Sequence, residues 1–283
     1  MFGKRSDGRK IKTINPLFRI MPHIMKRRSD AHVYYTTDIP LNKLDEYINL
    51  KEQDGIKISY MHIVYTALVR ILGERPSFNR FVMNGRFYAR NEILISLAIK
   101  KELTIEGEET TLKIPYTGEE TIFEVKEKLD NEILKNKELS NENDTDLLVK
   151  VLAKMPNFLL KFAINTLMFL DRHNHLPKPI IHASPFHSSA FLTNVGSLGI
   201  DAVYHHIYDF GTVGLFIAMG KKKKNYIYEE DKIIEGKTIS IAVVGDERIC
   251  DGFYYTSALK AFNRYLKKPE LLEQKGVPVK DID

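Results

Sequence analysis

The sequence predicts an α/β fold in which β-strands and amphipathic helices alternate along the chain. The clearest observation is at residues 238–268, where a buried strand, a polar turn and a helix follow in succession. Thr238 to Val244 is β-branched and apolar, which is typical of a strand covered on both faces. From Phe253 apolar residues recur at helical spacing, and Pro269 ends the helix.

The composition narrows the class of protein. The chain has 283 residues, 43% hydrophobic and 28% charged, which suits a substantial core and excludes global disorder. The net charge of +5 favours an anionic ligand such as a coenzyme with phosphates, although scattered surface lysines would give the same balance. Basic residues are not interleaved with aromatics, so nucleic acid is not expected. Cys250 is the single cysteine, which fits a cytoplasmic protein, and no signal peptide is recognisable.

The N-terminal third predicts one strand and several helices. Ser59 is a suitable N-cap, and Asn84-Gly85 is a two-residue hairpin signal. The expected elements are an amphipathic helix in Ile14–Arg28, a strand at His32–Ile39, a short helix at Leu41–Lys51 and a helix at Tyr60–Leu72.

The middle of the chain changes from strand to helix. We expect a strand at Ile93–Ile99, a polar pair of strands in Leu103–Pro115 and a helix at Thr121–Asn136, and the stretch 141–146 is expected to be exposed. Leu147–Leu170 has one helical pattern and is nearly apolar in its second half. It is too short and too interrupted by polar residues to span a bilayer. Packing on the core or on a partner subunit is the first interpretation, and contact with a membrane surface is the second.

The C-terminal third predicts further strands of the sheet. Ala190–Gly199 indicates a strand and a tight turn, and Gly214–Met219 indicates another strand. We interpret the lysine-rich residues 220–225 as the tip of a basic hairpin, which Tyr226–Ile234 continues.

Three segments resemble one family of enzymes. D-E-R-I-C-D-G-F at 246–253 resembles the D-H-R-x-x-D-G motif of the dihydrolipoyl acyltransferases of 2-oxoacid dehydrogenase complexes, and is similar to H-H-x-x-x-D-G-F of chloramphenicol acetyltransferase. A-F-L-T-N-V-G-S-L-G at 190–199 resembles F-T-I-S-N-L-G-S-x-G. H-V-Y-Y-T-T-D-I at 32–39 is similar to H-F-Y-L-T-x-D-V.

The resemblance implies a chloramphenicol acetyltransferase-like mixed sheet flanked by helices in a trimer-forming α/β protein. The expected organisation is a single acyltransferase-like catalytic domain over residues 1–283, with a helical insertion at about 137–189 and no lipoyl or subunit-binding domain. The expected partners are acyl-CoA and two further copies of the chain. The resemblance also allows the trimers to assemble further.

The resemblance also implies the roles of individual residues. Thr193 takes the place of the serine whose hydroxyl stabilises the oxyanion, and Glu247 takes the place of the histidine that acts as general base. Asp251 is the carboxylate that keeps the turn in shape. The turn formed by Asn194, Gly196 and Ser197 is expected to bind coenzyme A. In this family Thr193 of one subunit would face Glu247 of the next.

The identity of the base remains open in the sequence. A glutamate has an ordinary pKa of about 4.3, too acidic to deprotonate a thiol well; burial would raise the pKa of Glu247, and Arg248 would lower it. His205, with Asp209 four residues later, and His187 are alternative bases. The simpler interpretations are an ion-paired corner at 246–251 and structural histidines.

Two functions therefore follow as expectations. The first is a coenzyme A-dependent acyltransferase that moves an acyl group between a pantetheine thiol and an unidentified acceptor. The alternative is a catalytically inactive homologue that acts as a trimeric binding or scaffold module. Histidines at 173, 175, 205 and 206 lack carboxylate or cysteine partners at ligand spacing, so no metal is expected.

Overall fold

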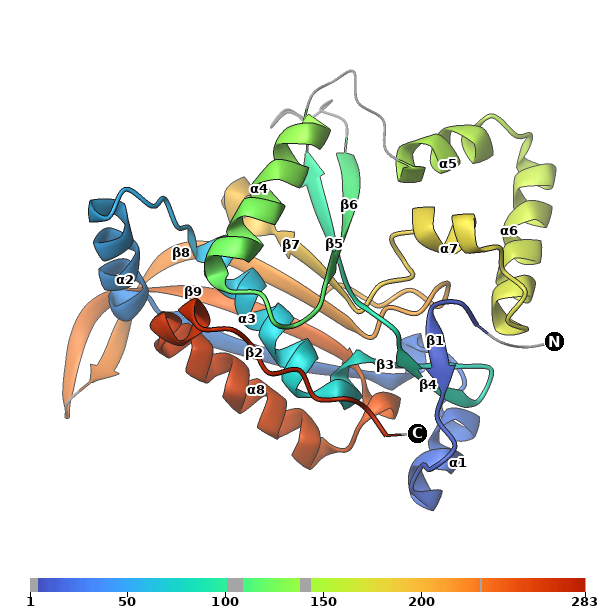
Figure 1. Cartoon of the computed structure of the whole chain (residues 1–283), viewed down its shortest axis with the longest axis horizontal. Coiled ribbons are helices and arrows are strands. Elements are labelled where there is room, and N and C mark those ends of the chain that lie inside the picture. The colour runs from blue at the N-terminus through green and yellow to red at the C-terminus, as the bar shows by residue number, and fades with distance from the viewer. Residues whose placement is uncertain (1–4, 101–108, 138–143, 230, 283) are drawn as a thin grey trace.

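The protein is built on a six-stranded mixed sheet with helices on its faces (Figure 1). A computed structural model describes residues 5–100, 109–137, 144–229 and 231–282. The strand order is β2-β9-β8-β7-β5-β6, and β7 runs parallel to both neighbours while the other pairs are antiparallel. The predicted α/β fold is thus confirmed. The strands are β2 (His32–Pro40), β5 (Ile93–Lys100), β6 (Glu109–Tyr116), β7 (Ala190–Asn194), β8 (Leu215–Glu229) and β9 (Lys232–Asp246).

The main core lies between one face of this sheet and a layer of helices. Alternate strand residues such as Leu192, Ile217 and Ile241 point to this face and are buried. Helix α3 begins where the Ser59 side chain accepts a hydrogen bond from the amide of His62, as the sequence predicts. The helices of this layer are α2 (Asn42–Gln53), α3 (Tyr60–Glu74), α4 (Ile122–Lys137) and α8 (Gly252–Lys267).

A smaller three-stranded sheet lies beside the N-terminus (Figure 1). Its order is β1-β4-β3, and Asn84 and Gly85 connect β3 to β4 with positive φ angles, as predicted for the hairpin. Helix α1 occupies only the middle of the predicted stretch, because Asn15 caps its start and the helix ends at Ile24. The elements are β1 (Gly8–Lys10), α1 (Pro16–Ile24), β3 (Arg80–Met83) and β4 (Arg86–Arg90).

The stretch Leu147–Leu170 is helical, as its pattern predicts, but it is divided in two. The structure has two helices there, because Pro156 lacks an amide hydrogen and disfavours helical geometry in the residue before it. None of the helices in the described residues is long and apolar enough to cross a bilayer. These helices and the next are α5 (Asp144–Ala153), α6 (Asn157–Arg172) and α7 (Lys178–Ala183); residues 103–108 and 141–143 of the predicted elements lie outside the described part.

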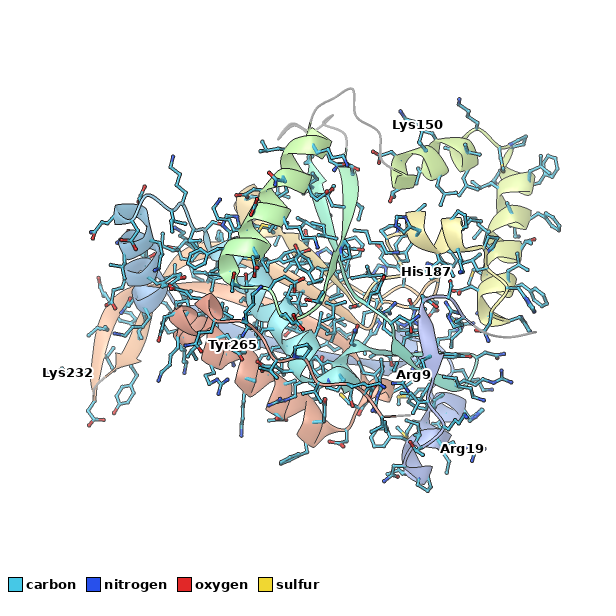
Figure 2. The ribbon with its side chains drawn as sticks, in the orientation of Figure 1. Arg9, Arg19, Lys150, His187, Lys232 and Tyr265 are labelled. Carbon is cyan, nitrogen blue, oxygen red and sulfur yellow. The ribbon has the colours of Figure 1, made fainter. Side chains whose placement is uncertain are left out.

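The prediction of a hairpin tip at residues 220–225 is wrong. The lysines lie within β8, which continues to Glu229, and β9 begins at Lys232. The register shifts between Met219 and Lys222, and the two strands then form a ribbon that projects from the body of the molecule (Figure 1), with Lys232 at its far end (Figure 2). Its lysine and tyrosine side chains are largely exposed to solvent, as expected for strands that are not covered by helices.

Candidate active site

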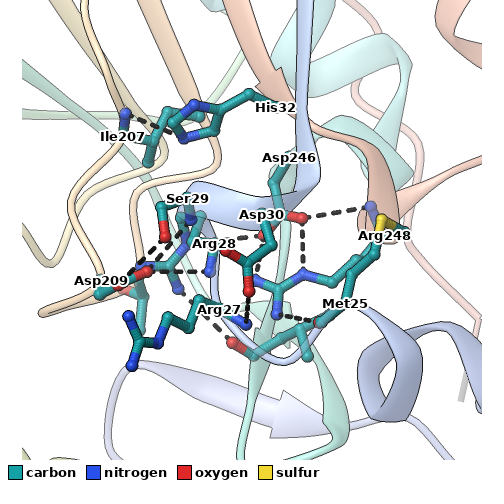
Figure 3. Close-up of polar contacts among 12 residues, drawn as sticks. Met25, Arg27, Arg28, Ser29, Asp30, His32, Ile207, Asp209, Asp246 and Arg248 are labelled. Atoms are coloured by element: carbon teal, nitrogen blue, oxygen red, sulfur yellow. Dashed lines mark hydrogen bonds and ion pairs between the residues drawn. The ribbon is translucent and has the colours of Figure 1, made fainter.

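The corner between β9 and α8 is held by a buried carboxylate. Asp246 is 1% exposed and accepts hydrogen bonds from Nε and Nη2 of Arg248 at 2.8 and 2.7 Å. Its second oxygen lies 3.5 Å from Nε of Arg28, which is 3% exposed (Figure 3). The negative charge of this buried carboxylate is compensated, because two guanidinium groups lie against it. The ion-paired corner expected from the sequence is therefore present.

The two predicted acidic residues of this corner have different environments. Glu247 begins a turn of 3₁₀ helix and is exposed to solvent. Asp251 is the N-cap of α8, where its Oδ1 accepts a hydrogen bond of 2.7 Å from the amide of Tyr254. Asp251 thus fixes the start of the helix, in keeping with the predicted role of holding the corner in shape. Burial raises the pKa of the neighbouring Cys250 thiol to about 12, so Cys250 is an inert core residue.

Thr193 lies further along the sheet and two strands away from this corner. The register aligns Thr193 with Ala218 on β8, and Ala218 with Ala242 on β9. Asp246 is four residues further along β9, about 14 Å at the rise of an antiparallel strand, and Glu247 lies beyond it. Thr193 and Glu247 of one chain are therefore too far apart to act on the same atom.

The turn after Thr193 is as compact as predicted. Ser197 Oγ donates a hydrogen bond of 2.7 Å to the carbonyl oxygen of Asn194, and Gly199 has a left-handed backbone with φ of 80°. A Cβ atom on Gly196 would lie 2.3 Å from the carbonyl oxygen of Gly220. The close approach of the two backbones therefore requires glycine at 196.

His205 lies on the same face of the sheet as Thr193. Its ring stacks on Phe216 with centroids 4.5 Å apart, and Phe216 is two residues before Ala218 on β8. His205 is half-buried, and its Nε2 has no hydrogen-bond partner among the described residues. Burial, and secondly the charge of His206, lower the pKa of His205 below its ordinary value. A neutral imidazole with a free nitrogen is the form that can accept a proton.

No hydrogen bond joins His205 to Asp209, the acidic residue four positions later, among the described residues, because Asp209 has other partners. Its Oδ1 accepts hydrogen bonds from the amides of Arg28 and Ser29 at 2.9 and 3.1 Å (Figure 3). The aspartate therefore anchors the loop before β2.

His187 is a structural residue in a buried charge network. It is fully buried, its Nδ1 lies 2.9 Å from Ser184 Oγ, and its Nε2 lies 3.3 Å from Asp171. Asp171 in turn pairs with Arg5 at 2.8 Å. Burial lowers the pKa of His187, and Asp171 acts in the opposite direction. The network joins α6 to the start of the chain and leaves His187 no route to Thr193.

Two further polar residues near the site were not singled out in the sequence. His32 is aligned with Asp246, and its Nε2 accepts a hydrogen bond of 3.3 Å from the amide of Ile207 (Figure 3). Thr36 Oγ1 donates a hydrogen bond to the hydroxyl of Tyr204. Both lie on β2, within the strand that resembles the acyltransferases, and that resemblance was the signal that could have identified them. Among the described residues no group of three or more His, Cys, Asp or Glu could hold a metal ion.

The fold is that of the chloramphenicol acetyltransferase-like α/β proteins. Residues 182–273 match the family described as 2-oxoacid dehydrogenases acyltransferase (catalytic domain), which confirms the resemblance predicted from the sequence. The matched range contains Thr193, His205 and the whole corner. No curated protein sequence matches the chain.

Solved structures support the fold over nearly the whole chain. A probable dihydrolipoamide acetyltransferase from Listeria monocytogenes 4b F2365 has a TM-score of 0.56 and 17% identity, covering 92% of this chain and 95% of its own. The dihydrolipoamide acetyltransferase of Azotobacter vinelandii has a TM-score of 0.55 and 12% identity over 92% and 93%. A chloramphenicol acetyltransferase has a TM-score of 0.53 and 12% identity over 92% and 100%.

Proposed function

We propose that the protein is an acyltransferase that moves an acyl group between coenzyme A, or a related pantetheine thiol, and an acceptor of unknown structure. The observation that supports this proposal most strongly is the family match over residues 182–273, which includes both segments on which the chemistry depends. The similar fold of a chloramphenicol acetyltransferase is a second support.

The proposed active site lies between two copies of the chain in a homotrimer. Within one chain the sheet register separates Thr193 from Glu247 by well over 14 Å, so only a neighbouring subunit could bring such residues together. One similar structure is the cubic core of a pyruvate dehydrogenase multienzyme complex, which shows that a related fold assembles with itself. The assembly of this chain beyond a trimer is part of the same proposal.

The proposed mechanism begins when the acceptor attacks the thioester carbonyl carbon. The carbonyl oxygen becomes an oxyanion, to which the Thr193 hydroxyl donates a hydrogen bond. Collapse of this intermediate breaks the C–S bond, and the proton taken from the acceptor passes to the leaving thiolate. The Azotobacter protein was investigated for a serine, a histidine and an asparagine in its mechanism, in the same chain order as Thr193, Glu247 and Asp251.

The base in this mechanism is either His205 or Glu247 of the neighbouring subunit. His205 is supported by its free Nε2 and by its place on the face of Thr193. Glu247 is supported by its place in the corner but is exposed to solvent, where a carboxylate remains too acidic to accept a proton from a thiol efficiently. We therefore assign the proton transfer to His205 first.

A second candidate function is a trimeric module that binds coenzyme A without turning it over. The observation that favours it is Glu247, which stands where the resembling enzymes have their catalytic histidine. The fold and the coenzyme-binding turn at Asn194, Gly196 and Ser197 would then be retained for binding alone.

The two functions are separated by a turnover assay on the purified protein. Acyl-coenzyme A would be incubated with a panel of amines, alcohols and thiols, and release of free thiol would be measured. We expect turnover that falls about 100-fold in Thr193→Ala and is largely kept in Thr193→Ser, because serine retains the hydroxyl. Calorimetric binding of coenzyme A with no turnover would instead support the binding module, and turnover unaffected by Thr193→Ala would refute the mechanism.

A further inference from the structure

A pocket of about 430 Å³ lies on the outer side of the corner, between elements that are distant in the sequence. It is formed by the end of α1 and the loop after it, the β3–β4 turn, the end of α6, and the residues that surround the buried Asp246. Its lining residues are Pro22, His23, Lys26, Arg27, Arg28, Val82, Met83, Asn84, Gly85, Arg172, Asp209 and Arg248. We call this cavity the basic pocket.

The basic pocket carries an excess of positive charge. Five of its lining residues are lysine or arginine, and one, Asp209, is acidic. The side chains of Lys26, Arg27 and Arg172 are at the surface and form no hydrogen bond or ion pair with the described residues. Asp30 accepts a hydrogen bond from the backbone of Arg27 and leaves the guanidinium group uncompensated (Figure 3).

The floor of the pocket holds two guanidinium groups in fixed positions. Arg28 donates to the carbonyl oxygens of Tyr208 and Val82 at 2.7 and 3.5 Å, and Arg248 donates to that of Met25 at 3.2 Å (Figure 3). These two cations share the single carboxylate of Asp246. Nε of Arg28 is buried and has no hydrogen-bond partner among the described residues. Asp246 and Asp209 together balance the charges of Arg28 and Arg248, so the excess positive charge of the pocket comes from the surface cations Lys26, Arg27 and Arg172.

We propose that the basic pocket binds a phosphate or pyrophosphate group of a small molecule. Guanidinium groups match the geometry and charge of phosphate oxygens, and those that are already fixed lose little entropy on binding. The pocket has the volume of a small-ligand site. No Phe, Tyr or Trp is among its described lining residues, so a base or an adenine ring would have no aromatic platform there. The anionic group is thus the part of the ligand that is recognised.

This inference is independent of the acyl-transfer proposal. Arg172 belongs to α6, which lies outside the range 182–273 that matches the acyltransferase family. The pocket is therefore completed by residues outside the matched range, although Asp209 and Arg248 of its lining lie inside it. Binding of an anion there requires neither Thr193 nor His205.

The test is titration calorimetry of the full chain with inorganic phosphate and pyrophosphate at constant ionic strength. We expect pyrophosphate to bind with one site per chain, and the double variant Arg27→Gln/Arg172→Gln to bind at least 10-fold more weakly. The matched control is Lys221→Gln/Lys224→Gln, which removes the same charge from exposed positions of β8, far along the sheet from the pocket. Circular dichroism of both variants would verify that they fold like the parent chain.

Competition separates the two sources of such a group. If coenzyme A displaces pyrophosphate, its diphosphate is the group that the pocket binds, and if it does not, the ligand is a separate phosphate compound. Absence of pyrophosphate binding at millimolar concentration would overturn the proposal. An equal loss of affinity in the pocket variant and the control would overturn it as well, because the attraction would then come from net charge alone.

Discussion

Asp246 is the residue that the corner of the candidate site depends on. It is the buried carboxylate shared by Arg28 and Arg248. Asp246→Asn would leave two buried guanidinium groups without a counter-charge, so we expect the free energy of unfolding to fall by about 3–5 kcal/mol. Urea unfolding followed by circular dichroism measures this loss.

The neighbouring Glu247 supplies the control for that measurement. Glu247→Gln changes an exposed side chain, so we expect less than about 0.5 kcal/mol of change in the free energy of unfolding. Equal effects at the two positions would contradict the ion-paired structure of the corner.

The pH dependence of turnover identifies the base. His205 must be neutral to accept a proton, and its pKa lies below the ordinary value of 6.5 because the ring is half-buried. The rate should therefore rise with pH through a midpoint below 6.5 and be level at neutral pH. His205→Gln should remove this acid limb and lower the rate about 100-fold or more, as expected for loss of a general base.

The matched variant for this experiment is His206→Gln, since His206 is the exposed neighbour in the chain. It should keep the rate at neutral pH and the acid limb, with the midpoint moved upward because the charge of His206 no longer lowers the pKa of His205. If the fall in rate at acidic pH remains in His205→Gln and disappears in Glu247→Gln, the base is the carboxylate of Glu247 from the neighbouring subunit and not His205.

The sequence predicted the residue types of the site better than their contacts. The helix cap at Ser59 and the buried state of Cys250 depend on residues close in the chain, and both predictions were correct. The sequence predicted an ion-paired corner but not the partners of Asp246, of which Arg248 is two residues away and Arg28 is at the other end of the chain. Pairing between residues so far apart in the sequence depends on the fold, so local sequence patterns cannot predict it.

Helices and strands differ in how far local patterns could predict them. The helix at 253–268 and the strand at 32–39 were predicted nearly to their bounds, because one apolar face packs on the core in each. The break at Pro156 was missed because the apolar pattern resumes after it with the same period. The long β8–β9 ribbon was missed because its lysines resemble a turn, whereas in the structure they pair across to β9 and Lys223 lies 3.3 Å from Asp38.

The close approach of two elements at Gly196 gives a prediction at this scale. A methyl group there would meet the carbonyl oxygen of Gly220 at 2.3 Å, and a backbone cannot yield as a flexible side chain can. We expect Gly196→Ala to lower the free energy of unfolding by about 1–3 kcal/mol, as overpacking does. Denaturant unfolding, together with coenzyme A binding, measures the effect on the turn.

Gly252→Ala is the comparison for this change. Gly252 opens α8, has no heavy atom within 4 Å of an added Cβ, and does not have a positive φ. Alanine there should be neutral or slightly stabilising, because it reduces the entropy of the unfolded chain. If both glycines tolerate alanine equally, β7 and β8 do not approach as closely as the structure indicates.

In the whole molecule, the positions of the candidate site residues on the sheet favour assembly of several copies of the chain. One face is covered by α3 and α8, and the other carries Thr193 and His205. The corner with Glu247 follows the end of β9, more than four residues along the strand from the position level with Thr193. A single chain thus presents two halves of a site at separate places, which is the arrangement expected if each half meets its complement on a neighbouring copy.

Mixing of inactive subunits tests this arrangement directly. Chains with Thr193→Ala and chains with Glu247→Gln would be unfolded together and refolded at equal concentration. If each site takes Thr193 from one subunit and Glu247 from the next, random assembly gives about a quarter of the sites both native residues, so activity should return to about a quarter of the parent value. The second mixture combines chains with Thr193→Ala and chains with His205→Gln. If Thr193 and His205 of the same chain act in one site, this mixture should restore no activity, because every chain lacks one of the two residues. A monomer in sedimentation, or no recovery in the first mixture when each variant alone is inactive, would exclude a site shared between subunits.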